Sequence, residues 1–259
     1  MIDSHCHLAD RKFAADLSGV ISQANAAGVT HMVTIADDVS EAEKCRQLAE
    51  KYDQLFYTVG VHPHAAKEWN VEHGKSKVLE CAQDKKMVAV GEIGLDYHYM
   101  NSPKDDQIRA FYDQIVIAQE LNFPIVVHNR ESFEDLLSII DELKPTAMVL
   151  HCCTEEWANA KKLIELGYLL GFTGIATYPK SVAIREVIKQ CPLKQMMIET
   201  DAPYLAPEGR RGERCEPAMV TEVAKCIADI KGVSLQEVDR ITTKNTMDFY
   251  RLSPDILAL

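Results

Sequence analysis

Eight short apolar segments alternate with helical patterns along the whole chain, and this alternation constrains the fold more than any other feature. Several of the segments are apolar almost without interruption, as expected for strands that are buried on both faces of a sheet. The expected strands cover residues 1–7, 30–35, 55–61, 87–93, 124–128, 147–151, 168–172 and 196–201.

The segments between these strands carry the signals of helices. Residues 17–27 have an apolar stripe at the helical period, and Gly28 follows as the expected C-cap. The spacing predicts helices over 40–51 and from 234 onward, each opened by a serine with a glutamate three residues later. Two more helices are expected at 104–121 and 155–166.

Alternating strands and helices over 259 residues predict an α/β fold, a single TIM-type (β/α)8 barrel, which needs about 250 residues. One domain is therefore expected over residues 1–259. An open doubly wound sheet is the alternative, but no G-x-G-x-x-G or phosphate-binding loop follows any strand.

Composition excludes several classes of protein. The 28 Lys and Arg against 39 Asp and Glu give a net charge of −11, which disfavours a protein that coats nucleic acid or binds lipid. A phosphate held at a small site by metal ions is compatible with this charge. The chain has no apolar segment of about 18–20 residues, no secretory signal and no C-x-x-C pair among its eight cysteines, so we expect a cytoplasmic protein with reduced thiols.

Six of the nine histidines stand at the expected carboxyl ends of strands, which is where such a barrel places its catalytic groups. Four carboxylates fall at the ends of the fourth and eighth strands. Mixtures of imidazole and carboxylate are ligands that suit a metal ion. The residues are His5, His7, His62, His64, His128 and His151, with Glu92, Asp96, Glu199 and Asp201.

The strongest single motif is D-S-H-C-H at residues 3–7. Because side chains alternate along a strand, Asp3, His5 and His7 project from one face, and the two imidazoles, about 7 Å apart along it, can converge on one ion. Taken alone, an H-x-H pair is equally compatible with a chance occurrence on an edge strand. Together with the ligand-type residues that end other strands, it predicts a metal site at the carboxyl ends of the barrel strands.

Glu92 ends the apolar segment V-A-V-G. A charged carboxylate buried at a barrel mouth costs several kcal/mol unless it is paired or binds metal. One carboxylate can bridge two ions, and two ions about 3.5–4 Å apart stabilise a hydrolytic transition state. A salt bridge from Glu92 to Arg130 is the alternative.

His62 and His64 flank Pro63 after the third strand, where they could bind metal or donate to substrate oxygens. We favour donors, because the ion positions already have enough ligands. Arg130 shares a strand face with His128, and its planar guanidinium suits a phosphate. A structural ion pair is the alternative for Arg130.

Nucleophilic catalysis by a side chain is not indicated. No G-x-S-x-G motif is present, so a serine-hydrolase elbow is unsupported. Cys152 and Cys153 follow His151, but Cys152 points away from the face that His151 uses, and packing is the expected role of both thiols.

Taken together, the motifs resemble those of the TatD family of metal-dependent deoxyribonucleases, within the amidohydrolase-like barrels. The resemblance covers essentially the whole chain, and its motifs stand in the family's order. They are D-S-H-C-H at 3–7, G-V-H-P-H at 60–64, G-E-I-G-L-D-Y at 91–97, H-N-R at 128–130, H-C at 151–152, T-Y-P-K at 177–180 and E-T-D-A-P-Y-L at 199–205.

This resemblance implies two divalent ions, Zn, Mn or Mg, and a role for each matching residue. Asp201 would orient or deprotonate the attacking water, so the implied catalytic residues are Asp201 and Glu92. The implied assignment is His5, His7 and Asp201 on one ion, His128 and His151 on the other, Glu92 bridging them, His64 and Arg130 with His62 on the substrate, and Asp3, Asp96 and Glu199 behind the ligands.

Two departures from the family pattern lie in rim loops. Cys215 replaces the asparagine of the family's R-N-E-P segment, and Cys153-Thr154-Glu155 replaces a phenylalanine followed by a Ser/Thr-Gly pair. They bear on substrate choice rather than on the metal chemistry.

The implied function is a cytoplasmic hydrolase of phosphodiester bonds, a 3'-5' exonuclease on single-stranded DNA that uses water activated by two metal ions. A hydrolase of an ester, lactone, amide or aminoacyl-tRNA bond on the same barrel is the alternative, although a neutral ester needs neither Arg130 nor His64. A non-catalytic metal-binding protein is disfavoured because structural zinc is closed by four ligands, usually with Cys. DNA, or RNA or tRNA, is the expected partner, with no membrane and no stable protein partner, and the chain is expected to be a monomer or a weak homo-oligomer.

Overall fold

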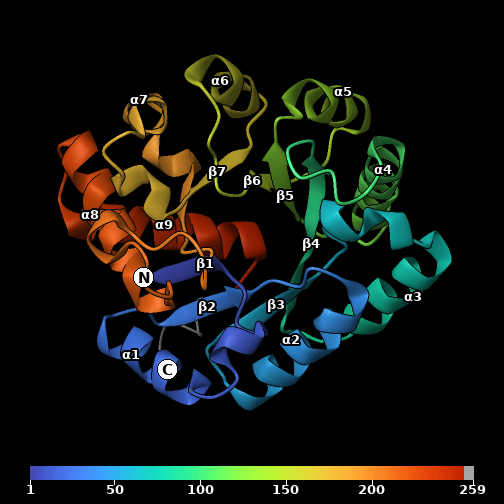
Figure 1. Ribbon diagram of the computed structural model, residues 1–259, viewed down its shortest axis with the longest axis horizontal. Coiled ribbons are helices and arrows are strands. Elements are labelled where there is room, and N and C mark those ends of the chain that lie inside the picture. Colours follow the sequence, from blue (N-terminus) through green and yellow to red (C-terminus); the bar gives the residue numbers. More distant parts are fainter. Residues whose placement is uncertain (254–259) are drawn as a thin grey trace. The chain divides into compact units, whose positions relative to one another are not determined.

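The computed structural model describes residues 1–253, and residues 254–259, the end of the predicted domain, lie outside the described part. Within the described part, eight strands belong to one sheet and follow each other in chain order, from β1 to β8 (Figure 1). This order, with helices between the strands, defines the (β/α)8 barrel and confirms the predicted fold class. The chain divides into two compact units, Met1–Val33 with Cys152–Leu259 and Thr34–His151, and each is described by itself.

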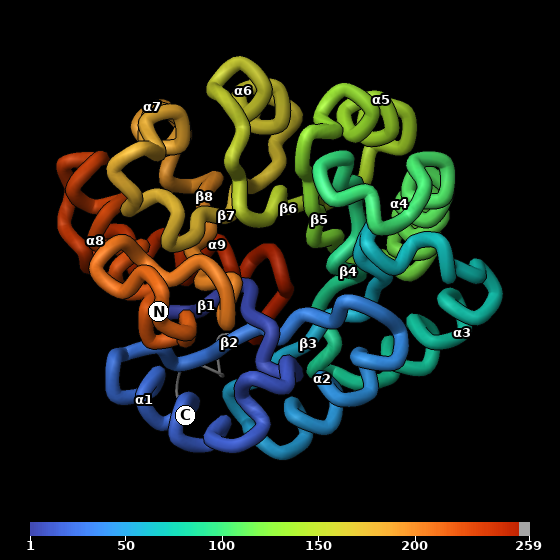
Figure 2. Tube along the Cα trace, viewed as in Figure 1, coloured from blue at the N-terminus to red at the C-terminus, as the bar shows by residue number. Residues whose placement is uncertain are grey.

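The unit Thr34–His151 contains four parallel strands with helices beside them. Helices α3, α4 and α5 run along the outer side of β3, β4 and β5 (Figure 2). The elements are α2 (Val39–Lys51), β3 (Leu55–Val59), η2 (Pro63–Glu68), α3 (Val71–Cys81), β4 (Met87–Asp96), α4 (Lys104–Glu120), β5 (Ile125–Arg130), α5 (Phe133–Leu143) and β6 (Met148–Leu150).

Strand β4 is longer than predicted, so Glu92 lies within the strand and not at its end as expected. The register shifts between Val90 and Ile93, where the Glu92 amide donates to Ala36 O at 3.3 Å. Beyond this irregularity, Gly94 pairs with His128 at a φ of +143°. Any Cβ at Gly94 would overlap the backbone of His128, so this close approach of β4 and β5 requires glycine.

The other unit contains strands β1, β2, β7 and β8. The last residue of β2, Thr34, is the first residue of the unit Thr34–His151. Strand β7 pairs with β8 in parallel, with Gly171 opposite Met197. The elements are β1 (Ile2–Cys6), η1 (Arg11–Phe13), α1 (Leu17–Ala26), β2 (His31–Thr34), α6 (Trp157–Glu165), β7 (Leu169–Phe172), η3 (Gly174–Thr177), α7 (Val182–Gln190), η4 (Leu193–Gln195), β8 (Met196–Ile198), η5 (Glu208–Arg210), η6 (Pro217–Met219), α8 (Val220–Lys231) and α9 (Leu235–Tyr250).

The two predicted serine caps have different outcomes. Ser234 caps α9 by accepting from the amide of Glu237 at 3.1 Å, as expected. The prediction of Ser40 as the cap of α2 is wrong, because Asp38 accepts from the amides of Ser40 and Glu41 at 2.7 and 2.9 Å. A carboxylate held in extended backbone satisfies two of the helix's first amides at once.

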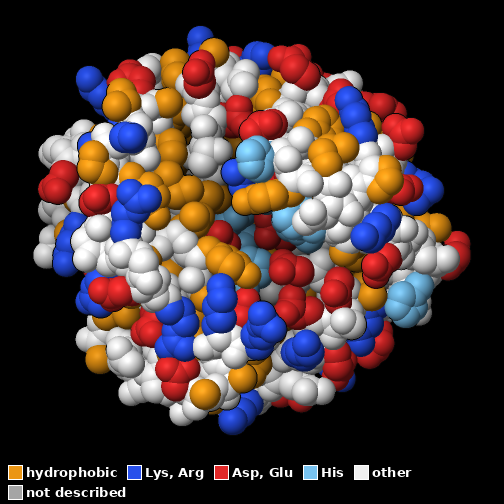
Figure 3. All heavy atoms as spheres, viewed as in Figure 1, with side chains coloured by type: hydrophobic (Ala, Val, Ile, Leu, Met, Phe, Trp, Pro, Cys, Tyr) orange, Lys and Arg blue, Asp and Glu red, His pale blue; other side chains and the backbone are white. Residues whose placement is uncertain are grey.

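Charged groups of both signs are interspersed on the face shown in Figure 3. Among the helices of residues 1–253, none combines the length and the apolar character needed to cross a membrane. All eight cysteines are free thiols, as the sequence predicts, and six of them are buried.

Candidate metal centre

The first group of candidate ligands lies in the unit that contains β1 and β8, and consists of His5, His7 and Asp201. His5 lies in β1, His7 follows it, and Asp201 stands three residues after β8. Two backbone hydrogen bonds join these segments: the Asp201 amide donates to His5 O at 2.9 Å, and the His7 amide donates to Ala202 O at 2.7 Å. Short strands thus bring together side chains that are almost 200 residues apart in sequence.

The ligand atoms of this group fit one metal ion. The Nε2 atoms of His5 and His7 are 3.3 Å apart, and they lie 3.6 and 3.2 Å from Asp201 Oδ1. An ion bound tetrahedrally at about 2.0–2.2 Å holds its ligand atoms roughly 3.4 Å apart. Asp201 reaches this position with a left-handed φ of +58°, an uncommon conformation for a residue other than glycine.

Asp3 and Thr200 hold the backbone on both sides of Asp201. Asp3 accepts from the Thr200 amide at 2.9 Å and from its hydroxyl at 2.6 Å, and that hydroxyl accepts from the Ala202 amide at 3.1 Å. Complete burial raises the pKa of Asp3 to about 8, although the hydrogen bonds from Thr200 oppose the rise. Asp3 therefore acts on Asp201 indirectly, through its hydrogen bonds to the neighbouring residue Thr200. Thr200, which we did not single out from the sequence, helps to hold the backbone around Asp201.

Glu199 occupies a tight position beneath the same segment. Its Oε1 accepts from the Cys152 amide at 2.6 Å, and its Oε2 accepts from the Ser4 hydroxyl at 3.3 Å. A Cβ at Gly171 would lie 2.6 Å from both carboxylate oxygens, so glycine leaves the room that Glu199 fills. Glu199 thereby fixes the backbone of the residue that follows His151.

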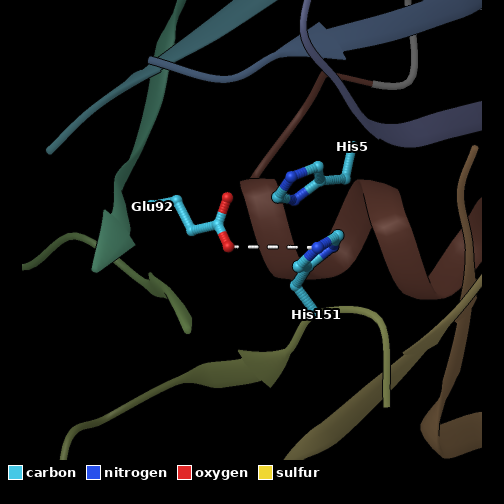
Figure 4. A group of neighbouring side chains, drawn as sticks. All are labelled: His5, Glu92 and His151. Carbon is cyan, nitrogen blue, oxygen red and sulfur yellow. Dashed lines mark ion pairs between the residues drawn. The ribbon is translucent and has the colours of Figure 1, made fainter. Parts of the chain in front are cut away.

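The second group lies in the unit Thr34–His151, around the buried carboxylate of Glu92. Its Oε1 lies 3.0 Å from His128 Nδ1, 3.8 Å from His62 Nε2 and 3.9 Å from His151 Nε2. Figure 4 shows the side chains of Glu92 and His151 pointing toward each other. His62, which the sequence analysis assigned to the substrate, thus lies among the candidate ligands.

Asp96 connects two histidines of this unit. Its Oδ2 lies 3.1 Å from Nε2 of both His64 and His128, and its Oδ1 accepts from the amides of His98 and Tyr99. Burial alone would lower the pKa of His128, but its hydrogen bonds to Asp96 and Glu92 raise it to about 8. Burial would raise the pKa of Asp96, yet the His128 contact and the other hydrogen bonds hold it well below its usual range.

Gln107 on α4 supports Asp96 from behind, and nothing in its sequence context indicated this role. Its side-chain oxygen accepts from the Asp96 amide at 2.8 Å, and its side-chain nitrogen donates to Asp96 O at 3.0 Å. Two glutamines, Gln107 and Gln114, interrupt the otherwise apolar buried face of α4. Arg130, at the end of β5, directs its guanidinium over the ring of Tyr99, with 4.7 Å between its Cζ and the ring centroid.

The cysteines beside His151 are unsuited to nucleophilic chemistry. Burial raises the pKa of the Cys152 thiol well above its ordinary value and that of Cys153 to about 12. The Cys152 sulfur lies 3.5 Å from the Thr173 hydroxyl. Because the thiolate is the reactive form, both thiols remain unreactive at neutral pH.

A (β/α)8 fold with two groups of imidazole and carboxylate side chains that could hold metal ions is typical of the metal-dependent hydrolases built on this barrel. The family model of the TatD-related DNases matches residues 2–251. The chain belongs to this family, as its motifs predict.

Two relatives and one solved structure match nearly the whole chain. The chain is 35% identical to the metal-dependent hydrolase YabD of Bacillus subtilis (strain 168), covering 98% of this chain and 100% of YabD. It is 32% identical to the 3'-5' ssDNA/RNA exonuclease TatD of Pantoea ananatis (strain LMG 20103), and the match covers 97% of this chain and 100% of that protein. The crystal structure of YJJV, a TatD homologue from Escherichia coli K12, superposes with a TM-score of 0.91 at 25% identity and covers 98% of each chain.

Proposed function

We propose that the protein is a 3'-5' exonuclease that hydrolyses phosphodiester bonds of single-stranded DNA with two divalent metal ions. The observation that carries the proposal is the arrangement of His5, His7 and Asp201, whose nitrogen and oxygen atoms stand at the separations that one ion imposes. Membership of the TatD-related DNases supports the choice of phosphodiester substrate, and the relative from Pantoea ananatis supports the polarity and leaves RNA as a second substrate.

The donor set supports the assignment of metal ligands. In the proposal, His5, His7 and Asp201 would hold one ion, His128 and His151 would hold the second, and Glu92 would serve both. Bound divalent ions lower the pKa of a water molecule and stabilise the charge on the attacked phosphate. Since imidazoles dominate the set, Zn²⁺ or Mn²⁺ should bind more tightly than Mg²⁺, which prefers oxygen ligands.

Asp201 is the proposed proton acceptor. Its Oδ1 faces the imidazoles of His5 and His7, so we assign the proton of the attacking water to Oδ2. The side chain is 14% exposed, and its backbone is fixed from both sides, so the carboxylate is oriented before substrate binds.

Arg130 and His64 are the proposed phosphate contacts. The guanidinium of Arg130 can bind two phosphate oxygens at once. His64 has a 35% exposed side chain whose Nε2 faces Asp96, so Nδ1 is the atom that can face a phosphate. In the proposal, Asp96 positions the imidazoles of His64 and His128, and His62 contacts the substrate beside Glu92.

A hydrolase of esters, lactones, amides or aminoacyl-tRNA is the alternative on the same fold. The name of YabD specifies only a metal-dependent hydrolase. The guanidinium of Arg130 at the end of β5 favours the phosphodiester, because a neutral ester gains little from a cation. We also propose that the enzyme acts in the cytoplasm, where its eight free thiols stay reduced, as a monomer or a weak homo-oligomer.

One preparation tests substrate and metal together. Elemental analysis should find up to two equivalents of Zn or Mn per chain, and single-stranded DNA should be hydrolysed faster than aminoacyl-tRNA or simple esters. Hydrolysis of esters with intact DNA strands would replace the proposal by its alternative.

A second assay tests cleavage from an end. Linear single-stranded DNA should be degraded, and the same sequence closed into a circle should persist on one gel, because the exonuclease needs a free terminus. Equal rates for both forms would replace the exonuclease by an endonuclease.

A further inference from the structure

An exposed tyrosine accompanies each group of candidate ligands, one in each compact unit. Tyr99 stands three residues after Asp96 and is 55% exposed, and Tyr204 stands three residues after Asp201 and is 45% exposed. Each backbone is fastened to its aspartate: the Tyr99 amide donates to Asp96 Oδ1 at 2.8 Å, and the Tyr204 amide donates to Asp201 O at 2.9 Å. Both rings are therefore held at fixed positions next to residues of the proposed centre.

In the unit Thr34–His151, the Tyr99 ring contacts the two proposed phosphate ligands. Arg130 Cζ lies 4.7 Å from its centroid, and the His64 ring lies 5.4 Å away in an edge-to-face arrangement. His98 packs against the ring from another side, at 4.8 Å. The ring thus lies directly beside the groups that would hold a phosphate.

In the other unit, Tyr204 has a matching environment. Lys12 Nζ lies 4.4 Å from its centroid, the His7 ring lies 6.2 Å away, and the Tyr204 hydroxyl lies 3.1 Å from Asp10 Oδ2. Helix η1, which carries Lys12, is held by Arg214, which donates to Lys12 O at 2.6 Å and to both carboxylate oxygens of Asp16 at 2.9 and 2.7 Å.

Packing does not explain this repeated arrangement. A core tyrosine would be buried, whereas each of these two residues is about half exposed. Each has a cation over its ring and a histidine ring in an edge-to-face arrangement, in a protein that carries a net charge of −11. An aromatic face beside a cation matches one repeating unit of a nucleic acid strand, which is a flat base joined to a phosphate.

We propose that Tyr99 and Tyr204 are stacking platforms for nucleobases of the bound strand, with Arg130 and Lys12 holding the adjacent phosphates. This inference rests on the proposed function and names the part of the substrate that the centre recognises. Stacking tolerates any base, because every base has an aromatic face. The enzyme would accordingly require bases near the cleaved end and show little sequence preference.

The test uses the full chain loaded with Mn²⁺ and two linear single strands. One is an ordinary oligonucleotide, and the other carries abasic residues at its last three 3' positions. The wild type should cleave the ordinary strand about 5- to 100-fold more efficiently, mainly through a lower KM, which corresponds to the loss of stacking measured by alanine substitution.

Variants of the two tyrosines test whether their rings cause the difference in kcat/KM between the ordinary and the abasic strand. In Tyr99→Leu and Tyr204→Leu the ratio of kcat/KM on the two strands should fall toward one, and in Tyr99→Phe and Tyr204→Phe it should stay near the wild-type value, because phenylalanine keeps the ring. Tyr112→Leu is the matched control, since Tyr112 lies on α4 and its hydroxyl bonds Glu142.

Two results would overturn the inference. A wild type that cleaves both strands equally well does not use stacking, and this comparison needs no variant to fold. Leucine variants that lose the same factor on both strands would show that the rings only support the structure. A wild type that cleaves neither strand with any divalent ion would overturn the proposed function itself, and the inference with it.

Discussion

The two groups of candidate ligands are held in place by different means. Around Asp201, backbone hydrogen bonds join the end of β1 to the segment after β8, and the three ligand atoms stand 3.2–3.6 Å apart. Around Glu92, side chains from separate segments converge at 3.0–3.9 Å from one carboxylate oxygen, and side-chain hydrogen bonds position the imidazole of His128.

This difference indicates which group is preformed. The Asp201 group already matches the separations of an ion's ligands, whereas in the other group Glu92 and His128 contact each other directly at 3.0 Å. An ion that enters the second group must change distances that spread from 3.0 to 3.9 Å, and an ion that enters the first finds distances of 3.2–3.6 Å. We therefore expect the His5, His7 and Asp201 site to bind metal more tightly.

Removal of metal should have the largest effect on the rate of hydrolysis. Exhaustive chelation should abolish hydrolysis, and stepwise return of Zn²⁺ or Mn²⁺ should restore it in two phases that calorimetry resolves as a tight and a weaker site. His7→Ala should remove the tight phase, and His128→Ala the weaker one. Full activity with no metal left by elemental analysis would contradict the metal mechanism, and the reverse order of affinities would contradict the comparison.

Asp201→Asn separates the ligand role from the proton acceptor. The amide keeps an oxygen for the ion but cannot accept the proton, so kcat should fall about 10²–10⁴-fold while metal is partly retained. Single-turnover kinetics measures the loss of rate, and elemental analysis of the same sample measures the metal that is retained. Complete loss of the tight ion would show that Asp201 acts mainly as a ligand.

Glu199 and its glycine should have a smaller effect, as expected for residues that position others. Glu199→Gln should lower activity about 10–100-fold, and Gly171→Ala should do the same without changing the charge of any residue, since its Cβ would displace the Glu199 carboxylate. Gly19→Ala is the matched control, because a Cβ there meets no atom. If Glu199→Gln were more damaging than Asp201→Asn, the two roles would have to be exchanged.

The sequence predicts the strands better than their boundaries, for physical reasons that single residues show. Apolar runs place all eight strands, and the period of two places His5 and Asp3 on β1. The extension of β4 to Asp96 depends on a register shift and on the fit of Gly94 against His128, which no pattern within one segment contains.

The sequence predicts the candidate ligands and the acidic residues Asp3, Asp96 and Glu199 behind them, but not the uncharged residues that support them. Histidines at the ends of apolar strands are easy to recognise, because an ionisable side chain next to an apolar segment needs a partner. Thr200 and Gln107 act through hydrogen bonds to residues that are distant in sequence or on another element, so their roles follow only from the fold. The role of His62 stays a prediction: the sequence favours substrate, and its Nε2 lies 3.8 Å from Glu92 Oε1.

The smallest expected effect concerns salt, and it tests whether cations beyond the two ligand groups contribute to binding. With a net charge of −11, the protein should neutralise only two or three phosphates of the strand, through Arg130 and Lys12 among the residues described. Binding of a single-stranded oligonucleotide should then fall with salt at a log–log slope of about −1.4 to −2. Lys12→Gln should make the slope shallower by about 0.7, because one cation near Tyr204 is lost, and Lys161→Gln on α6, which pairs with Glu165, should leave it unchanged. Fluorescence anisotropy from 50 to 300 mM salt checks this, and an unchanged slope in Lys12→Gln would confine phosphate contacts to the Glu92 group.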